Sequence, residues 1–91
     1  MTILLARRGA RPETIVMERL AFIPSRLKVS KGTVVLFENR DVSPHTVTAD
    51  NRAFDSGLIG PGGAFRIRVD RSTSLHCEIH AGMAATLLVS G

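Results

Sequence analysis

The chain has 91 residues, of which 44% are hydrophobic, and it contains one cysteine. This length allows one domain with one core and no separate catalytic domain, and a single cysteine excludes an intramolecular disulfide. Lys and Arg outnumber Asp and Glu by 12 to 8, but these basic residues are scattered and the only aromatic residues are four Phe, which argues against nucleic-acid binding.

The N-terminal segment does not have the pattern of a targeting or membrane segment. A short apolar run is followed by Arg7 and Arg8, whereas a secretory signal places its charges before a longer apolar stretch. No part of the chain approaches the roughly 20 apolar residues of a membrane helix, so we expect no membrane insertion. We expect residues 1–12 to be an N-terminal arm or a remnant of expression, and residues 13–91 to form the domain.

The rest of the chain consists of short β-prone segments separated by turn residues. The clearest is Thr33–Asn39, which is rich in β-branched and aromatic residues. Phe65–Val69 alternates apolar residues with Arg66 and Arg68, which predicts one buried and one solvent-exposed face. About seven or eight such strands can close as two packed antiparallel sheets, so the predicted fold class is an all-β sandwich. The other expected strands are residues 13–20, 26–29, 45–49, 73–78 and 86–90.

Three candidate metal ligands follow one another at three-residue spacing near the C-terminus, as Cys77, His80 and Met83. A straight strand would point Cys77 and His80 to opposite faces, so we expect a loop around Gly82 that turns all three side chains inward. His45 stands at the start of another predicted strand. It meets the loop if the two strands are neighbours in the sandwich.

Two imidazoles, one thiolate and one thioether are the donors of a blue-copper site. Zinc fits less well, because methionine is not among its usual ligands. Each residue alone has a simpler interpretation, as a partly buried histidine, a buried cysteine or a core methionine. Their joint spacing predicts one type 1 copper ion bound by His45, Cys77, His80 and Met83.

From about Thr14 to Ser90 the chain resembles the cupredoxins, the blue copper proteins of the plastocyanin and amicyanin type. The short spacing from Cys77 to Met83 is similar to that of amicyanin. The segments that carry the resemblance are Phe22–Pro24, Leu27–Val29, Lys31–Val35, Pro44–Ala49, Phe54–Gly57, Gly60–Gly62 and Cys77–Met83.

This resemblance implies a Greek-key β-sandwich with His45, Cys77 and His80 as equatorial ligands and Met83 as the axial ligand. It also implies that the backbone N–H of Thr46 donates to the Cys77 sulfur and tunes the potential. His80 would be the ligand whose ring edge is open to solvent, and electrons would pass through it.

The family resemblance further implies an electron carrier, not an enzyme, that cycles between Cu(I) and Cu(II) and exchanges electrons with redox partner proteins. The net charge of +4 favours acidic partners, and we expect a monomer. Proteins of this type usually work outside the cytoplasm, so we expect a periplasmic or other extracytoplasmic location.

Two residues depart from the pattern of the family. Thr46 stands where relatives often carry Asn, and Glu78 where they carry Ser or Thr, side chains that commonly link the two ligand segments. Whether Thr46 and Glu78 form such a link stays open at this point. His76 precedes a proposed ligand, but strand alternation points it away from the site, as a surface histidine.

Two other functions remain open. The chain could be a copper-binding module for copper delivery, storage or sensing, which the sequence does not exclude. It could also be an enzyme with Cys77 as the nucleophile and His45 or His80 as the base. The enzyme hypothesis leaves Met83 without a role, and no oxyanion site is apparent in the sequence.

Overall fold

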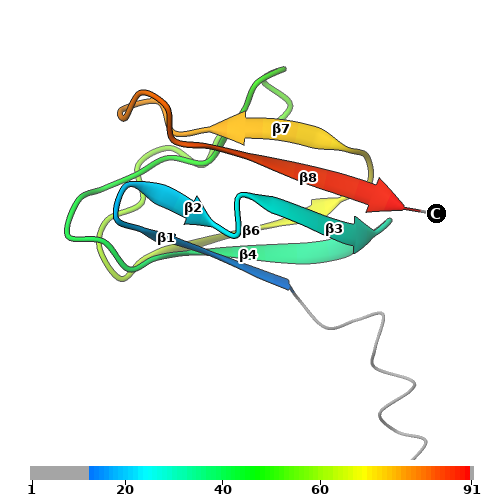
Figure 1. Cartoon of the computed structure of the whole chain (residues 1–91), viewed down its shortest axis with the longest axis horizontal. Helices are drawn as coiled ribbons and strands as arrows, with labels where there is room; N and C mark the ends of the chain where they lie inside the picture. Colours follow the sequence, from blue (N-terminus) through cyan, green and yellow to red (C-terminus); the bar gives the residue numbers. More distant parts are fainter. Residues whose placement is uncertain (1–12, 91) are drawn as a thin grey trace, which may run out of the picture.

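The computed structural model describes residues 13–90, so the arm predicted for residues 1–12 lies outside the described residues. Eight strands in the described part form two four-stranded sheets (Figure 1). The first sheet has the order β2-β1-β4-β6 and the second the order β3-β8-β7-β5. This arrangement confirms the predicted all-β sandwich. The strands are β1 Glu13–Glu18, β2 Ala21–Ile23, β3 Arg26–Ser30, β4 Thr33–Asn39, β5 Thr48–Ala49, β6 Ala64–Val69, β7 Thr73–His76 and β8 Ala84–Ser90.

The strand pairing is mainly antiparallel, with two parallel pairs. Strand β1 runs parallel to β4, and β3 runs parallel to β8. The chain moves from one sheet to the other several times between β2 and β7, as in other Greek-key sandwiches. No helix within residues 13–90 is long and apolar enough to cross a membrane.

The core lies between the inner faces of the two sheets. Val35 and Phe37 of β4, two residues apart on one face of the strand, are fully buried. The Phe37 ring lies 6.1 Å from that of Phe22 and 6.4 Å from that of Phe65, measured between centroids. Each such buried side chain contributes about 1.5–3 kcal/mol of transfer free energy. Met17 of β1 is also fully buried.

The first expected strand, residues 13–20, is shorter in the structure because it ends in a tight turn. Arg19 and Leu20 have φ angles of 56° and 60°, in the left-handed region, and connect β1 directly to β2. This conformation is unfavourable for residues other than glycine, asparagine and aspartate. The sequence therefore gave no local indication of the hairpin.

The segment 45–49, expected as one strand, is regular only at its end, in β5. His45 forms an isolated bridge with Ile59, and the N–H of Thr46 points to the sulfur of Cys77 instead of to a neighbouring strand. The expected strand 73–78 likewise ends at His76, because the N–H of Cys77 bonds to a residue of its own loop. On both segments, regular strand pairing is therefore interrupted at or next to the residues predicted to bind the metal.

The two segments that carry the predicted ligands lie at one end of the sandwich. In Figure 1 the segment between β4 and β5 and the loop between β7 and β8 meet at the end opposite the C-terminus. The sandwich is a rigid platform that holds these two connections side by side.

Candidate metal centre

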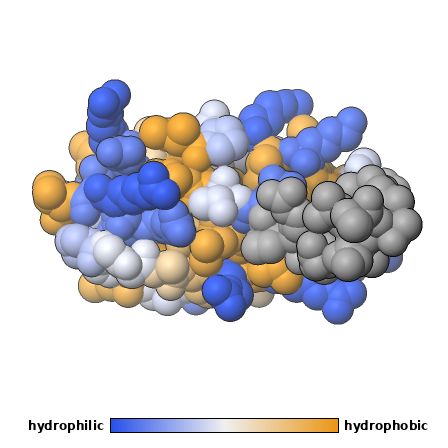
Figure 2. Space-filling view, turned by 90° about the horizontal axis from the view of Figure 1, so that it is seen from below, coloured by the Kyte–Doolittle hydropathy of each residue, from blue (hydrophilic) through white to orange (hydrophobic). Residues whose placement is uncertain are grey.

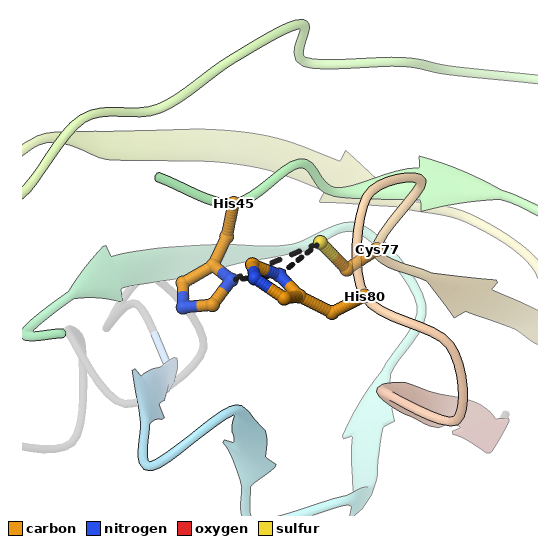
Figure 3. Close-up of side chains that lie close together, drawn as sticks. All are labelled: His45, Cys77 and His80. Atoms are coloured by element: carbon orange, nitrogen blue, oxygen red, sulfur yellow. Dashed lines mark hydrogen bonds between the residues drawn. The ribbon is translucent and has the colours of Figure 1, made fainter. Parts of the chain in front are cut away.

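Three of the predicted ligands converge in the structure. The Nδ1 atoms of His45 and His80 are 3.1 Å apart, and the Cys77 Sγ lies 3.8 Å from the first and 3.5 Å from the second. Figure 3 shows the three side chains pointing toward one another, with Cys77 and His80 from one loop and His45 from the other segment. These three donor atoms form the kind of group that can hold one metal ion.

The spacing of these atoms agrees with one shared ion. Nitrogen and sulfur donors that lie about 2.0–2.3 Å from an ion, at angles of 109–120°, are about 3.3–3.8 Å from one another. The observed separations of 3.1–3.8 Å lie close to that range. A thiolate with two imidazoles is a donor set suited to copper or zinc.

The loop from Cys77 to Met83 is closed by its own backbone. The N–H of Cys77 donates to the carbonyl of Met83 at 2.9 Å, and the N–H of Met83 donates to the carbonyl of His80 at 3.3 Å. Gly82 has φ 83°, which a residue with a side chain adopts only with strain. This turn ends at Met83, which is 2% exposed and lies directly before β8.

The two histidines differ in exposure. His45 is fully buried, and its backbone exchanges hydrogen bonds of 3.1 and 2.7 Å with Ile59. His80 is half-buried, and the two residues that follow it, Ala81 and Gly82, are exposed. The imidazole of His80 is therefore the part of the cluster nearest to solvent, as expected from the sequence.

Thr46 links the two ligand segments. Its N–H donates to the Cys77 Sγ at 3.4 Å, as the family resemblance implied. Its hydroxyl accepts a hydrogen bond of 2.8 Å from the N–H of Glu78 and pairs with the Thr48 hydroxyl at 3.0 Å. The open question of a link between Thr46 and Glu78 is thus answered: the link exists, and it uses the backbone of Glu78.

The Glu78 side chain belongs to a separate charged group on the surface. It pairs with His76, whose other ring nitrogen pairs with Asp50. These contacts raise the pKa of His76, chiefly through the hydrogen bond to Asp50, and lower the pKa of Glu78 through the hydrogen bond to His76. His76 points away from the cluster, as strand alternation predicted.

Asp41 is a residue of the site that the sequence analysis did not identify. Its Oδ2 lies 2.7 Å from the Nε2 of His45, on the ring edge opposite the cluster. The N–H groups of Leu20 and Arg19 also donate to its carboxylate, at 3.0 and 2.8 Å. The Leu20 N–H, followed by His45, lowers the pKa of this carboxyl. The only sequence indication was an acidic residue four positions before His45, in a loop that is polar throughout.

Comparison with curated proteins finds plastocyanins. The chain is 33% identical to the chloroplastic plastocyanin of Fritillaria agrestis in a match that covers 78% of this chain and 53% of that one. It is 28% identical to the plastocyanin of Vicia faba, covering 78% of this chain and 89% of that one. The chain spans about half the length of the two chloroplastic plastocyanins it matches. No protein-family model matches the chain.

Solved structures with the same fold include several copper proteins. A purple cupredoxin from Nitrosopumilus maritimus superposes with a TM-score of 0.80 at 20% identity, over 86% of this chain and 99% of that one. An oxidized mutant of amicyanin gives 0.77 at 18% identity, over 86% and 81%. A copper-containing nitrite reductase from Thermus scotoductus gives 0.77 at 24% identity, over 89% of this chain but 23% of the enzyme. At these identities the likeness concerns the fold.

Proposed function

We propose that this chain is a member of the cupredoxin family that holds one type 1 copper ion and carries single electrons between partner proteins. The observation that carries the proposal is the convergence of His45 Nδ1, His80 Nδ1 and Cys77 Sγ, all within 4.8 Å of one another. Copper bound there would supply reversible one-electron chemistry between Cu(I) and Cu(II).

The proposed ligands are His45, Cys77 and His80, with Met83 as the weak axial donor. Thiolate and thioether donors favour Cu(I), whereas imidazole is a good ligand for both oxidation states. The sandwich fixes the donors before any metal arrives, because His45 is bridged to Ile59 and the Cys77–Met83 loop is closed by its own hydrogen bonds. Little movement is then needed when an electron arrives or leaves.

The two histidines are buried to different extents, and we propose that they have different roles. His45, Cys77 and Met83 are 0%, 4% and 2% exposed, so water is excluded from that side of the site. His80 alone among the four is half-buried, with exposed residues beside it. We propose that partner proteins dock over His80, where the distance from the site to the molecular surface is shortest.

The partners are proposed to be acidic proteins. The net charge of +4 would speed their association, an effect that decreases with salt. Figure 2 shows one face of the molecule, on which hydrophilic and hydrophobic groups are interspersed. By its relatedness to plastocyanins, the chain is proposed to act as a monomer outside the cytoplasm, in a periplasm or an equivalent compartment.

A role in copper delivery, storage or sensing is the alternative. Among enzymes, the nitrite reductase shows that this fold also occurs as one part of a much larger copper protein. Here four proposed protein donors leave no open position for a substrate, unlike a catalytic metal site. Cys77 is also 4% exposed, whereas nucleophilic cysteines are accessible.

The test is the visible and EPR spectrum of the metal-free protein after one equivalent of Cu(II). We expect an intense thiolate-to-copper band that is absent in Cys77→Ser. A pale spectrum typical of ordinary Cu(II) would contradict the proposal. If the band forms, a second test distinguishes electron transfer from copper delivery. An electron carrier should exchange electrons rapidly with an acidic redox protein, whereas a delivery protein should transfer its copper to a metal-free acceptor.

A further inference from the structure

The carboxylate of Asp41 lies directly behind the buried ligand His45. Its Oδ2 is 2.7 Å from His45 Nε2, while Nδ1 on the other side of the ring is 3.1 Å from His80 Nδ1. The His45 side chain is fully buried and that of Asp41 is 14% exposed, so their contact is largely shielded from water. A neutral imidazole carries its proton on one nitrogen, and an acceptor at Nε2 leaves the Nδ1 lone pair free for a metal.

The position of Asp41 is set by further hydrogen bonds. Its carboxylate accepts from the N–H groups of Arg19 and Leu20, in the turn between β1 and β2, and its own N–H donates to Asn39 Oδ1 at 2.9 Å. The carboxylate is thereby held between a backbone turn and a ligand ring. Asp41 can therefore have two roles: it can stabilise the turn through the two N–H groups, and it can orient the His45 ring through Nε2.

Within residues 13–90 the Asp41 carboxylate forms no ion pair with a Lys or Arg side chain. Among the ion pairs of residues 13–90, Asp41 takes part only in the one with His45. The adjacent Arg40 pairs with Glu38 at 2.9 Å. A negative charge therefore lies at the Nε2–H edge of the imidazole, where metal-ligating histidines donate to a carboxylate, a backbone carbonyl or water.

We infer that Asp41 is a positioning residue of the metal centre: it orients the His45 ring with Nδ1 toward Cys77 and His80, and its charge favours the oxidised state of the site. The inference rests on the proposed copper function. A carboxylate behind a ligand imidazole makes that ligand a stronger donor and stabilises the higher positive charge, here Cu(II) over Cu(I). Without it, Cu(II) is disfavoured and the reduction potential rises.

The experiment must distinguish the effect of Asp41 on the turn between β1 and β2 from its effect on the ligand His45. We would first replace the turn by the favoured pair, with Arg19→Asn and Leu20→Gly, so that its geometry no longer depends on Asp41. In this background Asp41→Asn removes the charge and keeps nearly the same shape. Asp70→Asn is the matched control, since Asp70 is an exposed carboxylate paired with Arg68 beyond the end of β6.

The measured quantity is the reduction potential of the copper-loaded variants. We expect Asp41→Asn to lower the preference for Cu(II) over Cu(I) by about tenfold, which raises the potential by about 59 mV for one electron, while Asp70→Asn leaves it near that of the parent. An equal potential in the Asp41→Asn and Asp70→Asn variants would show that Asp41 only stabilises the turn between β1 and β2.

A second readout uses the metal-free protein. By ¹⁵N NMR we expect the His45 proton to reside on Nε2 in the parent and to lose that preference in Asp41→Ala, made in the same background. An unchanged tautomer would overturn the positioning role. If the parent binds Cu(II) without a thiolate band, the proposed function fails, but the tautomer still decides whether Asp41 orients the ring. If the band forms and neither potential nor tautomer responds, the inference alone fails.

Discussion

The backbone N–H of Thr46 donates a hydrogen bond to the sulfur of Cys77 across 3.4 Å. The same residue receives the N–H of Glu78 on its hydroxyl, at 2.8 Å, so it contacts the cysteine loop with both its backbone and its side chain. The two segments are 31 residues apart in sequence. Beyond the pairing of β5 with β7, Thr46 therefore joins the two segments next to the ligand cluster and contacts the Cys77 sulfur directly.

We expect Thr46→Val to destabilise the metal-free protein without removing the copper site. The variant keeps the backbone N–H to Cys77 but removes the acceptor of the Glu78 N–H, whereas the Thr48 hydroxyl keeps its hydrogen bond to Asp55. Leaving buried polar groups unpaired costs about 1–3 kcal/mol, measured here as the free energy of unfolding in urea. Thr46→Ser, which keeps the hydroxyl, is the control and should stay near the parent. Equal stability of the Val variant would contradict the role of the hydroxyl.

The turn between β1 and β2 offers a stabilising change. Arg19 and Leu20 both adopt left-handed backbone angles, and Leu20 is 52% exposed, so little packing is lost when it is replaced. We expect Arg19→Asn with Leu20→Gly to raise the free energy of unfolding by about 1 kcal/mol, because Asn-Gly favours this turn. Thermal unfolding of the metal-free protein measures it.

The same conformational argument predicts the opposite sign at another turn. Gly32 has φ 88°, so Gly32→Ala should lower the free energy of unfolding by about 1 kcal/mol, although an added methyl group would meet only the Arg68 side chain, at 3.7 Å. If both turns responded in the same direction, the explanation from backbone conformation would be wrong.

The fold was predictable because the sequence carries it in local patterns. The alternation in 65–69 and the composition of Thr33–Asn39 appear in the structure as β6 and β4 with the expected buried faces. The loop from Cys77 to Met83 was predictable from spacing, since three donors at intervals of three cannot share one side of a straight strand. These patterns involve neighbouring residues only.

What the sequence could not predict depends on contacts between distant residues. Asp41 contacts the turn at Arg19 and Leu20, about twenty residues earlier, and nothing in a polar loop distinguishes a carboxylate behind a ligand from a solvated one. The turn itself uses residues that normally avoid its backbone angles. Strand 45–49 was overestimated for a related reason, because the N–H of Thr46 is used by a sulfur atom of another segment.

A substitution of Met83 tests whether this residue is a copper ligand or only part of the core. Replacing a buried methionine with alanine costs about 2–5 kcal/mol wherever it lies, so loss of stability alone is not informative. Met17→Ala is the matched control, because Met17 is fully buried in β1. We expect both variants to be less stable, but only Met83→Ala to change the colour and the reduction potential of the copper-loaded protein. Unchanged spectra in Met83→Ala would remove it from the ligand set.

Stability should depend on pH through Asp55, which lies outside the ligand cluster. Its carboxylate accepts the N–H of Gly57 at 3.0 Å and the hydroxyl of Thr48 at 3.1 Å. The Gly57 N–H, then the Thr48 hydroxyl, lowers the pKa of Asp55 in the folded protein. Its stabilising effect is therefore complete above the unfolded pKa of about 3.9, and it is lost as the pH falls through the lower folded value.

The measurement is the urea midpoint of the metal-free protein between about pH 6 and pH 2, compared with Asp55→Asn, whose amide does not titrate in this range. Other acidic groups, including Asp41, titrate in both proteins, so the difference between the two isolates Asp55. We expect the parent to be more stable near neutral pH and the difference to shrink in acid, since a protonated carboxyl resembles the amide. A difference that stays constant across the range would mean that the charge of Asp55 does not strengthen its hydrogen bonds with Thr48 and Gly57.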